Sequence, residues 1–130
     1  MPKYEQPAAL YKDEETTILT AYQAFKNLGW NIDLAGDSGI SGSLPGKWNT
    51  KGARVTCHIQ DGQMIVSSES MNNEMFDLLK KNKKNTQKFI DAFNSLQSTG
   101  DLAIEQNKQA LSDLRYHTKE KIEEKLKYHY

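Results

Sequence analysis

The sequence has a single cysteine, Cys57, among its 130 residues. One cysteine forms no disulfide within the chain and supplies no thiolate cluster for a structural zinc ion. The histidines add no metal-ligand pattern, because His117 and His129 lie twelve positions apart rather than at the i, i+4 spacing of helical zinc ligands. We therefore expect no metal site, no cofactor and a reducing compartment.

Long apolar runs and a net charge are also missing. No stretch approaches the roughly 20 consecutive apolar residues of a transmembrane helix, and the first residues lack a signal-peptide core. Lysine plus arginine and aspartate plus glutamate both total 17, so the formal net charge is zero. Attraction to nucleic acid or to an anionic membrane would therefore need a local patch of charge. These absences favour a cytoplasmic protein.

Proline is scarce, and two of the three prolines fall within residues 1–12, where no hydrophobic period is visible. We expect this segment to be a loosely held arm. The remaining length, with 37% hydrophobic residues in the chain, suits one soluble core. Residues 13–98 are predicted to form that domain, and residues 101–130 a C-terminal amphipathic helix.

A first helix is predicted to begin after Asp13, whose side chain can cap it, and to end at Gly29. Apolar residues recur between them at spacings of three and four, as on the buried face of a helix. These residues are Ile18, Ala21, Tyr22, Phe25 and Leu28. Trp30, directly after the glycine, is expected to fold back on the last turn.

Four strands should follow the first helix. Alternating apolar residues predict short strands at 30–34 and 40–44, joined by the glycine-containing turn at 36–39. The Asp61-Gly62 pair predicts a type I′ turn between strands 53–60 and 63–70, which fixes their register. In that register Gln60 faces Gln63, Ile59 faces Met64, Cys57 faces Val66 and Val55 faces Ser68. The apolar side chains then share one face of the hairpin, and the other face carries Arg54, Thr56, His58, Ile65 and Ser67.

The rest of the chain has helical periodicity. Apolar residues at 75–79 and 89–96 predict either two short helices, with Asn85 as the cap of the second, or one continuous helix. Asp101 can cap a final helix that runs to about Leu126. Its apolar residues are few: Ile104, Leu111, Leu114, Ile122 and Leu126. A stripe this narrow predicts that the helix either lies across the domain or pairs with a second copy of itself.

Together these elements predict an α+β fold. We expect a four-stranded antiparallel meander in the order α-β-β-β-β-α, with the helices packed on one face and a long C-terminal helix. The other face of the sheet is expected to be open or covered by a partner.

Part of the chain resembles a small bacterial domain of unknown function, found alone or beside membrane-embedded segments, including those of rhomboid-type proteins. The resemblance is carried by Ala24-Phe25-Lys26-Asn27-Leu28-Gly29-Trp30, Ser67-Ser68-Glu69-Ser70, Met75-Phe76-Asp77, Lys81-Asn82-Lys83-Lys84-Asn85 and Phe89-Ile90-Asp91-Ala92-Phe93. It implies a fold and brings no catalytic residues, because the rhomboid protease machinery belongs to membrane helices.

Positive charge is concentrated between Asp77 and Asp91, where no acidic residue intervenes. The lysines of this block are Lys80, Lys81, Lys83, Lys84 and Lys88. Such a block suits anionic lipid headgroups at a membrane surface, or other phosphate-bearing ligands. Alternatively, the lysines only solvate a loop and a helix end, where positive charge complements the helix dipole. The absence of interleaved aromatic residues, with only two arginines in the chain, argues against nucleic acid.

No catalytic site is predicted. Cys57 and His58 are neighbours in a strand, so their side chains point to opposite faces and cannot form a thiolate–imidazole pair. We therefore expect a non-enzymatic interaction module that binds a protein partner or a second copy of itself. Its contact surface would be the C-terminal helix or the open sheet face with Arg54, Thr56, His58 and Ile65. Peripheral contact with a membrane through the lysine block is the alternative.

Overall fold

The structure is a computed structural model that describes residues 3–44, 52–70, 78–97 and 102–128. The expected apolar residues Met75 and Phe76 and the expected cap Asp101 lie outside these ranges.

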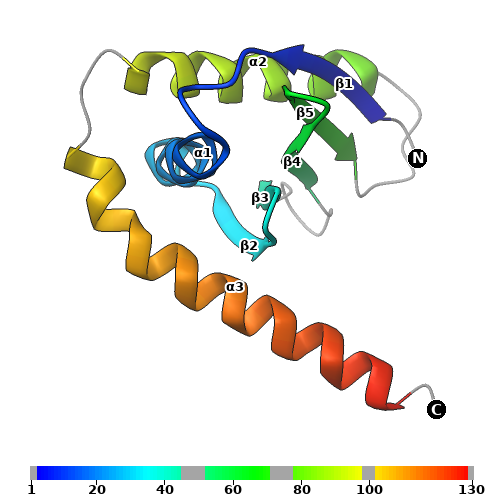
Figure 1. Ribbon diagram of the computed structural model, residues 1–130. Coiled ribbons are helices and arrows are strands. Elements are labelled where there is room, and N and C mark those ends of the chain that lie inside the picture. The colour runs from blue at the N-terminus through cyan, green and yellow to red at the C-terminus, as the bar shows by residue number, and fades with distance from the viewer. Residues whose placement is uncertain (1–2, 45–51, 71–77, 98–101, 129–130) are drawn as a thin grey trace.

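The described elements form an α+β fold with a five-stranded antiparallel sheet and three helices (Figure 1). Along the chain these are β1 (Lys3–Ala8), α1 (Glu14–Leu28), β2 (Asn31–Ala35), β3 (Gly39–Leu44), β4 (Ala53–Gln60), β5 (Gln63–Ser70), α2 (Leu78–Gln97) and α3 (Leu102–Tyr128). The strand order in the sheet is β1-β5-β4-β3-β2. The α+β class is confirmed, and β2 to β5 form the expected meander.

The expected count of four strands is wrong, because residues 3–8 of the expected arm form β1. This strand pairs antiparallel with β5, with Lys3 opposite Glu69 and Ala8 opposite Met64. Its alternate residues are half-buried, but two of them, Tyr4 and Gln6, carry polar groups, so the hydrophobic signal is weak. Pro7 fits β1 because an edge strand can accommodate a residue that donates no hydrogen bond.

Helix α1 begins and ends as its sequence predicts. The Thr16 backbone N–H donates to Asp13 Oδ1 at 2.7 Å, which caps the first turn. Gly29 has a left-handed φ of 72°, a conformation that other residues rarely adopt. Trp30 folds back, since its backbone N–H donates to Phe25 O and the two rings lie 6.1 Å apart.

The β4–β5 hairpin has the predicted register and turn. Gln60 lies opposite Gln63, and Cys57 lies opposite Val66. Both turn residues have positive φ, 52° at Asp61 and 75° at Gly62, as a type I′ turn requires. Cys57 is fully buried and His58 is on the opposite face.

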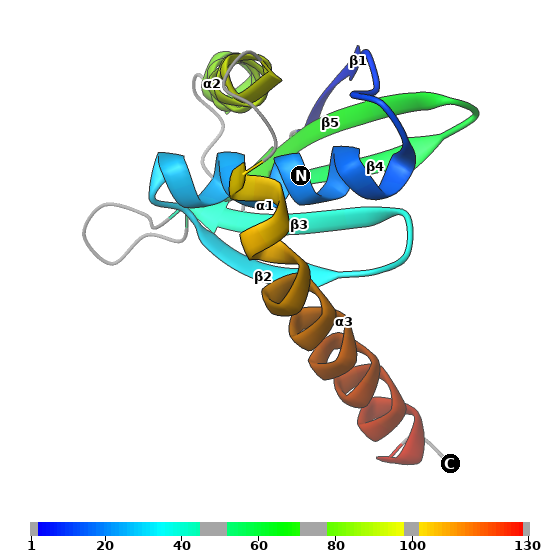
Figure 2. The ribbon, with the colours of Figure 1, turned by 60° about the vertical axis from the view of Figure 1, so that its left-hand side comes forward.

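The core lies between one face of the sheet and helices α1 and α2, which cover that face together (Figures 1 and 2). Phe89 is at its centre, with its ring 4.9 Å from Phe25 on α1 and 6.2 Å from Phe93 on α2. All three rings are fully buried. These contacts hold the two helices together above the sheet.

Helix α2 is one continuous helix rather than two, and a buried polar group fixes its position over β5. Asn82 Oδ1 accepts hydrogen bonds from Ser68 Oγ at 2.8 Å and Ser70 Oγ at 3.4 Å. The Thr86 hydroxyl donates to the Asn82 carbonyl oxygen. Buried polar groups are stable only when paired, so this network specifies where α2 sits along β5. Ser68 and Ser70 are both residues of β5.

The first half of α3 packs against the domain and the second half extends away from it (Figure 2). Leu111 is buried in the core, and Asn107 Nδ2 donates to Gln23 Oε1 on α1 at 2.9 Å. From residue 119 to residue 125 every side chain is exposed. The helix therefore lies across the domain over part of its length only.

Candidate interaction surfaces

The four residues predicted for the open sheet face lie on that face. His58 pairs with Ile65, and Thr56 pairs with Ser67, all with their side chains on the side opposite the core. Arg54 is exposed, whereas Thr56, His58 and Ile65 are half-buried. The structure therefore brings the four residues together on one mostly polar face of the sheet.

Charges of both signs alternate along one row of this face. Glu69 lies between Lys3 on β1 and Arg54 on β4. Lys3 Nζ also lies 2.9 Å from Glu5 Oε1, an exposed ion pair that lowers the pKa of Glu5 and raises the pKa of Lys3. This region has no concentration of one charge.

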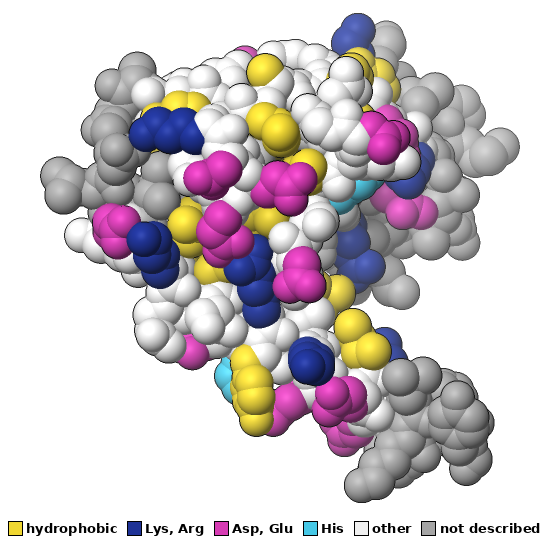
Figure 3. All heavy atoms as spheres, in the orientation of Figure 1, with side chains coloured by type: hydrophobic (Ala, Val, Ile, Leu, Met, Phe, Trp, Pro, Cys, Tyr) yellow, Lys and Arg dark blue, Asp and Glu magenta, His cyan; other side chains and the backbone are white. Residues whose placement is uncertain are grey.

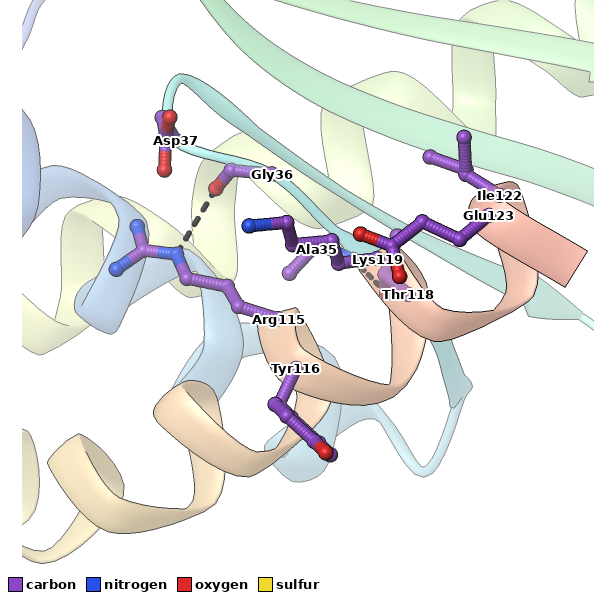
Figure 4. Close-up of a pocket in the computed structure, with 9 residues that line it drawn as sticks. All are labelled: Ala35, Gly36, Asp37, Arg115, Tyr116, Thr118, Lys119, Ile122 and Glu123. Carbon is purple, nitrogen blue, oxygen red and sulfur yellow. Dashed lines mark hydrogen bonds between the residues drawn. The ribbon is translucent and has the colours of Figure 1, made fainter. Parts of the chain in front are cut away.

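A second surface begins where α3 meets the β2–β3 turn. The Thr118 hydroxyl accepts a hydrogen bond from the Ala35 backbone N–H at 3.1 Å and donates to the Leu114 carbonyl oxygen. Arg115 Nε donates to the Gly36 carbonyl oxygen at 2.9 Å (Figure 4), and its Nη1 donates to Glu15 Oε1 at 2.8 Å. These bonds attach the middle of α3 to β2 and to α1.

Two adjoining hollows lie beside these bonds. The larger, which we call the helix hollow, has a volume of about 490 Å3 and lies between the turn and the second half of α3 (Figure 4). The smaller, the sheet hollow, has a volume of about 180 Å3 and reaches onto β3 and β4. Both are lined by Ala35, Gly36 and Thr118, so the two hollows are neighbours, and we call the pair the depression beside α3.

Exposed apolar side chains gather at this depression. Across the described part of the chain, the large hydrophobic residues that are exposed are Leu34 (36%), Tyr116 (63%) and Ile122 (56%). Tyr116 and Ile122 line the helix hollow, and Leu34 lines the sheet hollow. Large exposed apolar groups placed around one concavity are typical of an interaction site.

The second half of α3 has little support from the rest of the domain. Within the described ranges, no hydrogen bond or ion pair joins residues 119–125 to a residue outside α3. Acidic and basic side chains are interspersed over the lower part of the molecule, with apolar side chains among them (Figure 3). Over residues 119–125 this half of α3 therefore exposes a charge-balanced surface with one large apolar side chain, Ile122.

Thr118→Val is expected to lower the free energy of unfolding by about 1 kcal/mol, because valine keeps the shape but leaves the Ala35 N–H without its acceptor. Urea unfolding measures the loss, and amide exchange at Ala35 should become faster. Ser112→Ala, at an exposed position on the same helix, should change stability by less than about 0.5 kcal/mol. Equal stability of the two variants would show that the hydrogen bond contributes nothing.

The lysine block lies on the N-terminal half of α2. Lys81, Lys83, Lys84 and Lys88 are exposed, and among the described residues none of them forms an ion pair. The alternative explanation placed these lysines in a loop and at the end of a helix whose dipole favours positive charge. That placement is wrong, because α2 begins at Leu78 and the lysines therefore lie in its first turns, near the end where the dipole disfavours positive charge.

The single cysteine is not suited to act as a nucleophile. Burial raises the pKa of the Cys57 thiol to about 12, so no thiolate is available there near neutral pH. In the described ranges no group of three or more His, Cys, Asp or Glu side chains could hold a metal ion. The same ranges contain no helix both long and apolar enough to cross a membrane.

Comparisons with known proteins add little. No family model matches the chain, and no curated protein matches it significantly. The crystal structure of the vertebrate conserved region of human METTL16 is similar with a TM-score of 0.35 and 8% sequence identity. The match covers 66% of this chain and 80% of that one. Values this low carry no inference, and the resemblance to a small bacterial domain stays a prediction.

Sequence reasoning missed most of the depression beside α3, although Thr56, predicted for the open sheet face, lines the sheet hollow. Its bonds join residues far apart, since Arg115 contacts Glu15 one hundred positions earlier and Gly36 seventy-nine positions earlier. Ile122 also gave a local signal, as an apolar residue in a sparse stripe. Tyr116 and Leu34 become notable only once the fold brings them to the same place.

Proposed function

We propose that this protein is a non-enzymatic interaction module that binds a second copy of itself through the second half of α3 and the helix hollow. The observation that carries the proposal is the position of Tyr116 and Ile122. These two side chains are the most exposed large apolar groups of the described residues, and they line the same hollow.

The length of unsupported helix favours a partner at this position. Turns at the end of a helix that pack against nothing are marginal in water, because propagation alone barely offsets the loss of chain entropy. Residues 119–125 add two turns beyond Thr118, and all seven of their side chains are exposed. Pairing with another helix would cover Ile122 and stabilise these turns.

The charges favour a second copy as that partner. Residues 119–125 contain three lysines and three glutamates, and the hollow is lined by two acidic residues, Asp37 and Glu123, and two basic residues, Arg115 and Lys119. A surface with equal numbers of both signs can meet itself without net repulsion. In a two-fold dimer the second half of each α3 would lie beside the hollow of the other copy, which closes the assembly.

The open sheet face is the other candidate contact surface. It has alternating charge at Glu69 and Arg54 but only one half-buried apolar group, Ile65, among the four predicted residues. It therefore offers less apolar area, and the experiment must separate the two surfaces.

Light scattering after size exclusion, over a concentration series, tests the proposal. The wild-type chain should approach twice its 14.8 kDa mass as concentration rises. Ile122→Glu should shift the dissociation constant at least about tenfold toward monomer, because a charge would be buried at the contact. Gln106→Glu, which adds the same charge at an exposed position near the start of α3, should dimerise as the wild type does.

A spin label provides a second measurement. Cys57 is buried and unreactive, so a thiol introduced by Lys121→Cys would be the labelled one. A defined distance between two labels, lost on dilution with unlabelled chain, supports the dimer. A wild-type chain that stays monomeric at every concentration contradicts it, and loss of dimer with Arg54→Ala but not Ile122→Glu would assign the contact to the sheet face.

A further inference from the structure

The exposed side of α2 carries a row of lysines that the proposed dimer does not use. Lys81, Lys84 and Lys88 are separated by three and four residues, so they lie on one side of the helix. We call these three the lysine ridge. It spans about 10 Å along the helix axis, at 1.5 Å per residue. Lys83 is also exposed but lies on another side of α2.

The lysine ridge opposes the stability of its own helix. The N-terminus of a helix is the positive end of the dipole and favours acidic residues, yet the first turn of α2 contains Lys80 and Lys81 and no acidic residue. Lys84 also repels Lys81 and Lys88, because like charges three or four residues apart destabilise a helix. An arrangement that weakens the fold and lacks internal ion pairs is expected where it binds something else.

The opposite side of α2 holds the ridge in place. Asn82, Thr86 and Phe89 are fully buried, and the hydrogen bonds of Asn82 to β5 fix the position of the helix. The lysines therefore project from a rigid support, and ligand binding would not need to order the backbone.

We propose that the lysine ridge binds the phosphate groups of an anionic lipid surface. Lipid headgroups and free phosphate would both be bound by contact between phosphate oxygens and lysine ammonium groups. The arrangement favours a surface over a single phosphate, because the lysines are spread along the helix rather than gathered around one point. Phe89, Ile90 and Phe93 of α2 are buried in the core, so these apolar side chains are not free to insert into a bilayer. Binding would be electrostatic and would weaken at high salt.

Vesicle co-sedimentation with the full chain tests this inference. The wild type should bind vesicles of phosphatidylcholine with phosphatidylglycerol and should not bind phosphatidylcholine alone. Replacing the ridge by Lys81→Gln, Lys84→Gln and Lys88→Gln should weaken binding about 100-fold, since each lysine near an anionic surface contributes about fivefold. The matched variant Lys12→Gln, Lys26→Gln and Lys108→Gln loses the same charge from exposed positions outside the lysine ridge and the proposed dimer contact, and it should bind nearly as the wild type does.

A stability measurement distinguishes loss of binding from loss of fold. The ridge variant should be more stable than the wild type, with a thermal midpoint raised by roughly 3 °C, because the dipole and like-charge repulsion are relieved. Lower stability would contradict the electrostatic argument and overturn the inference. The inference would also be overturned if the ridge variant bound vesicles as well as the matched variant does, or if wild-type binding resisted high salt. Binding of inorganic phosphate or of a nucleic acid, with no binding to vesicles, would overturn it as well.

Discussion

Phe89→Ala is expected to lower the free energy of unfolding by about 3–5 kcal/mol. Phe89 is fully buried between Phe25 and Phe93, and it joins α2 to α1 as well as to the sheet. Removing the ring deletes its transfer free energy and leaves a cavity that the surrounding rings cannot fill. Urea unfolding followed by tryptophan fluorescence and by circular dichroism measures the change.

Phe89→Leu is the control for this prediction. Leucine keeps most of the apolar volume, so the expected loss is about 1 kcal/mol. A similar loss for the two variants would show that the site collapses readily and that the aromatic contact with Phe25 is not central. If only Phe89→Ala lost its cooperative unfolding transition, the free energy lost with the ring would exceed the whole free energy of unfolding of the domain.

The parts of the fold that the sequence predicts are set by short-range rules. The cap at Asp13 needs only the Thr16 N–H three residues later, and the end of α1 needs only the left-handed φ of Gly29. The β4–β5 register follows from a two-residue turn at Asp61 and Gly62, because the turn leaves one pairing possible. Each of these signals lies within a few residues of the structure that it determines.

The features that could not be predicted depend on contacts distant along the chain. Strand β1 has a weak pattern of its own and is stabilised by pairing with β5, some sixty residues later. Helix α2 continues through Asn85, which therefore caps no second helix, and Asn82 joins it to β5 by hydrogen bonds that the sequence pattern does not reveal. The hollow beside α3 forms only because Arg115 and Thr118 reach β2 and its turn.

Gly42→Val is expected to destabilise the domain by about 3 kcal/mol, at the upper end of the usual range for overpacking. A Cβ atom at Gly42 would lie 2.6 Å from the Asn31 carbonyl oxygen and 3.0 Å from Phe25 Cδ1. The carbonyl belongs to the paired strand β2, so it cannot move away without disturbing the β2–β3 ladder. Helix α1 can approach the sheet this closely only because position 42 has no side chain.

Gly36→Ala is the matched control, because a Cβ there meets nothing within 4 Å and the backbone φ lies outside the left-handed region. Its stability should change by less than about 0.5 kcal/mol. Gly42→Val should also affect the proposed dimer, since β2 leads to Ala35 and Gly36, which hold α3. We therefore expect faster amide exchange at Ala35 and weaker self-association in Gly42→Val. If Gly42→Val displaced β2 and the chain still dimerised fully, the two copies would pair through α3 without using the helix hollow.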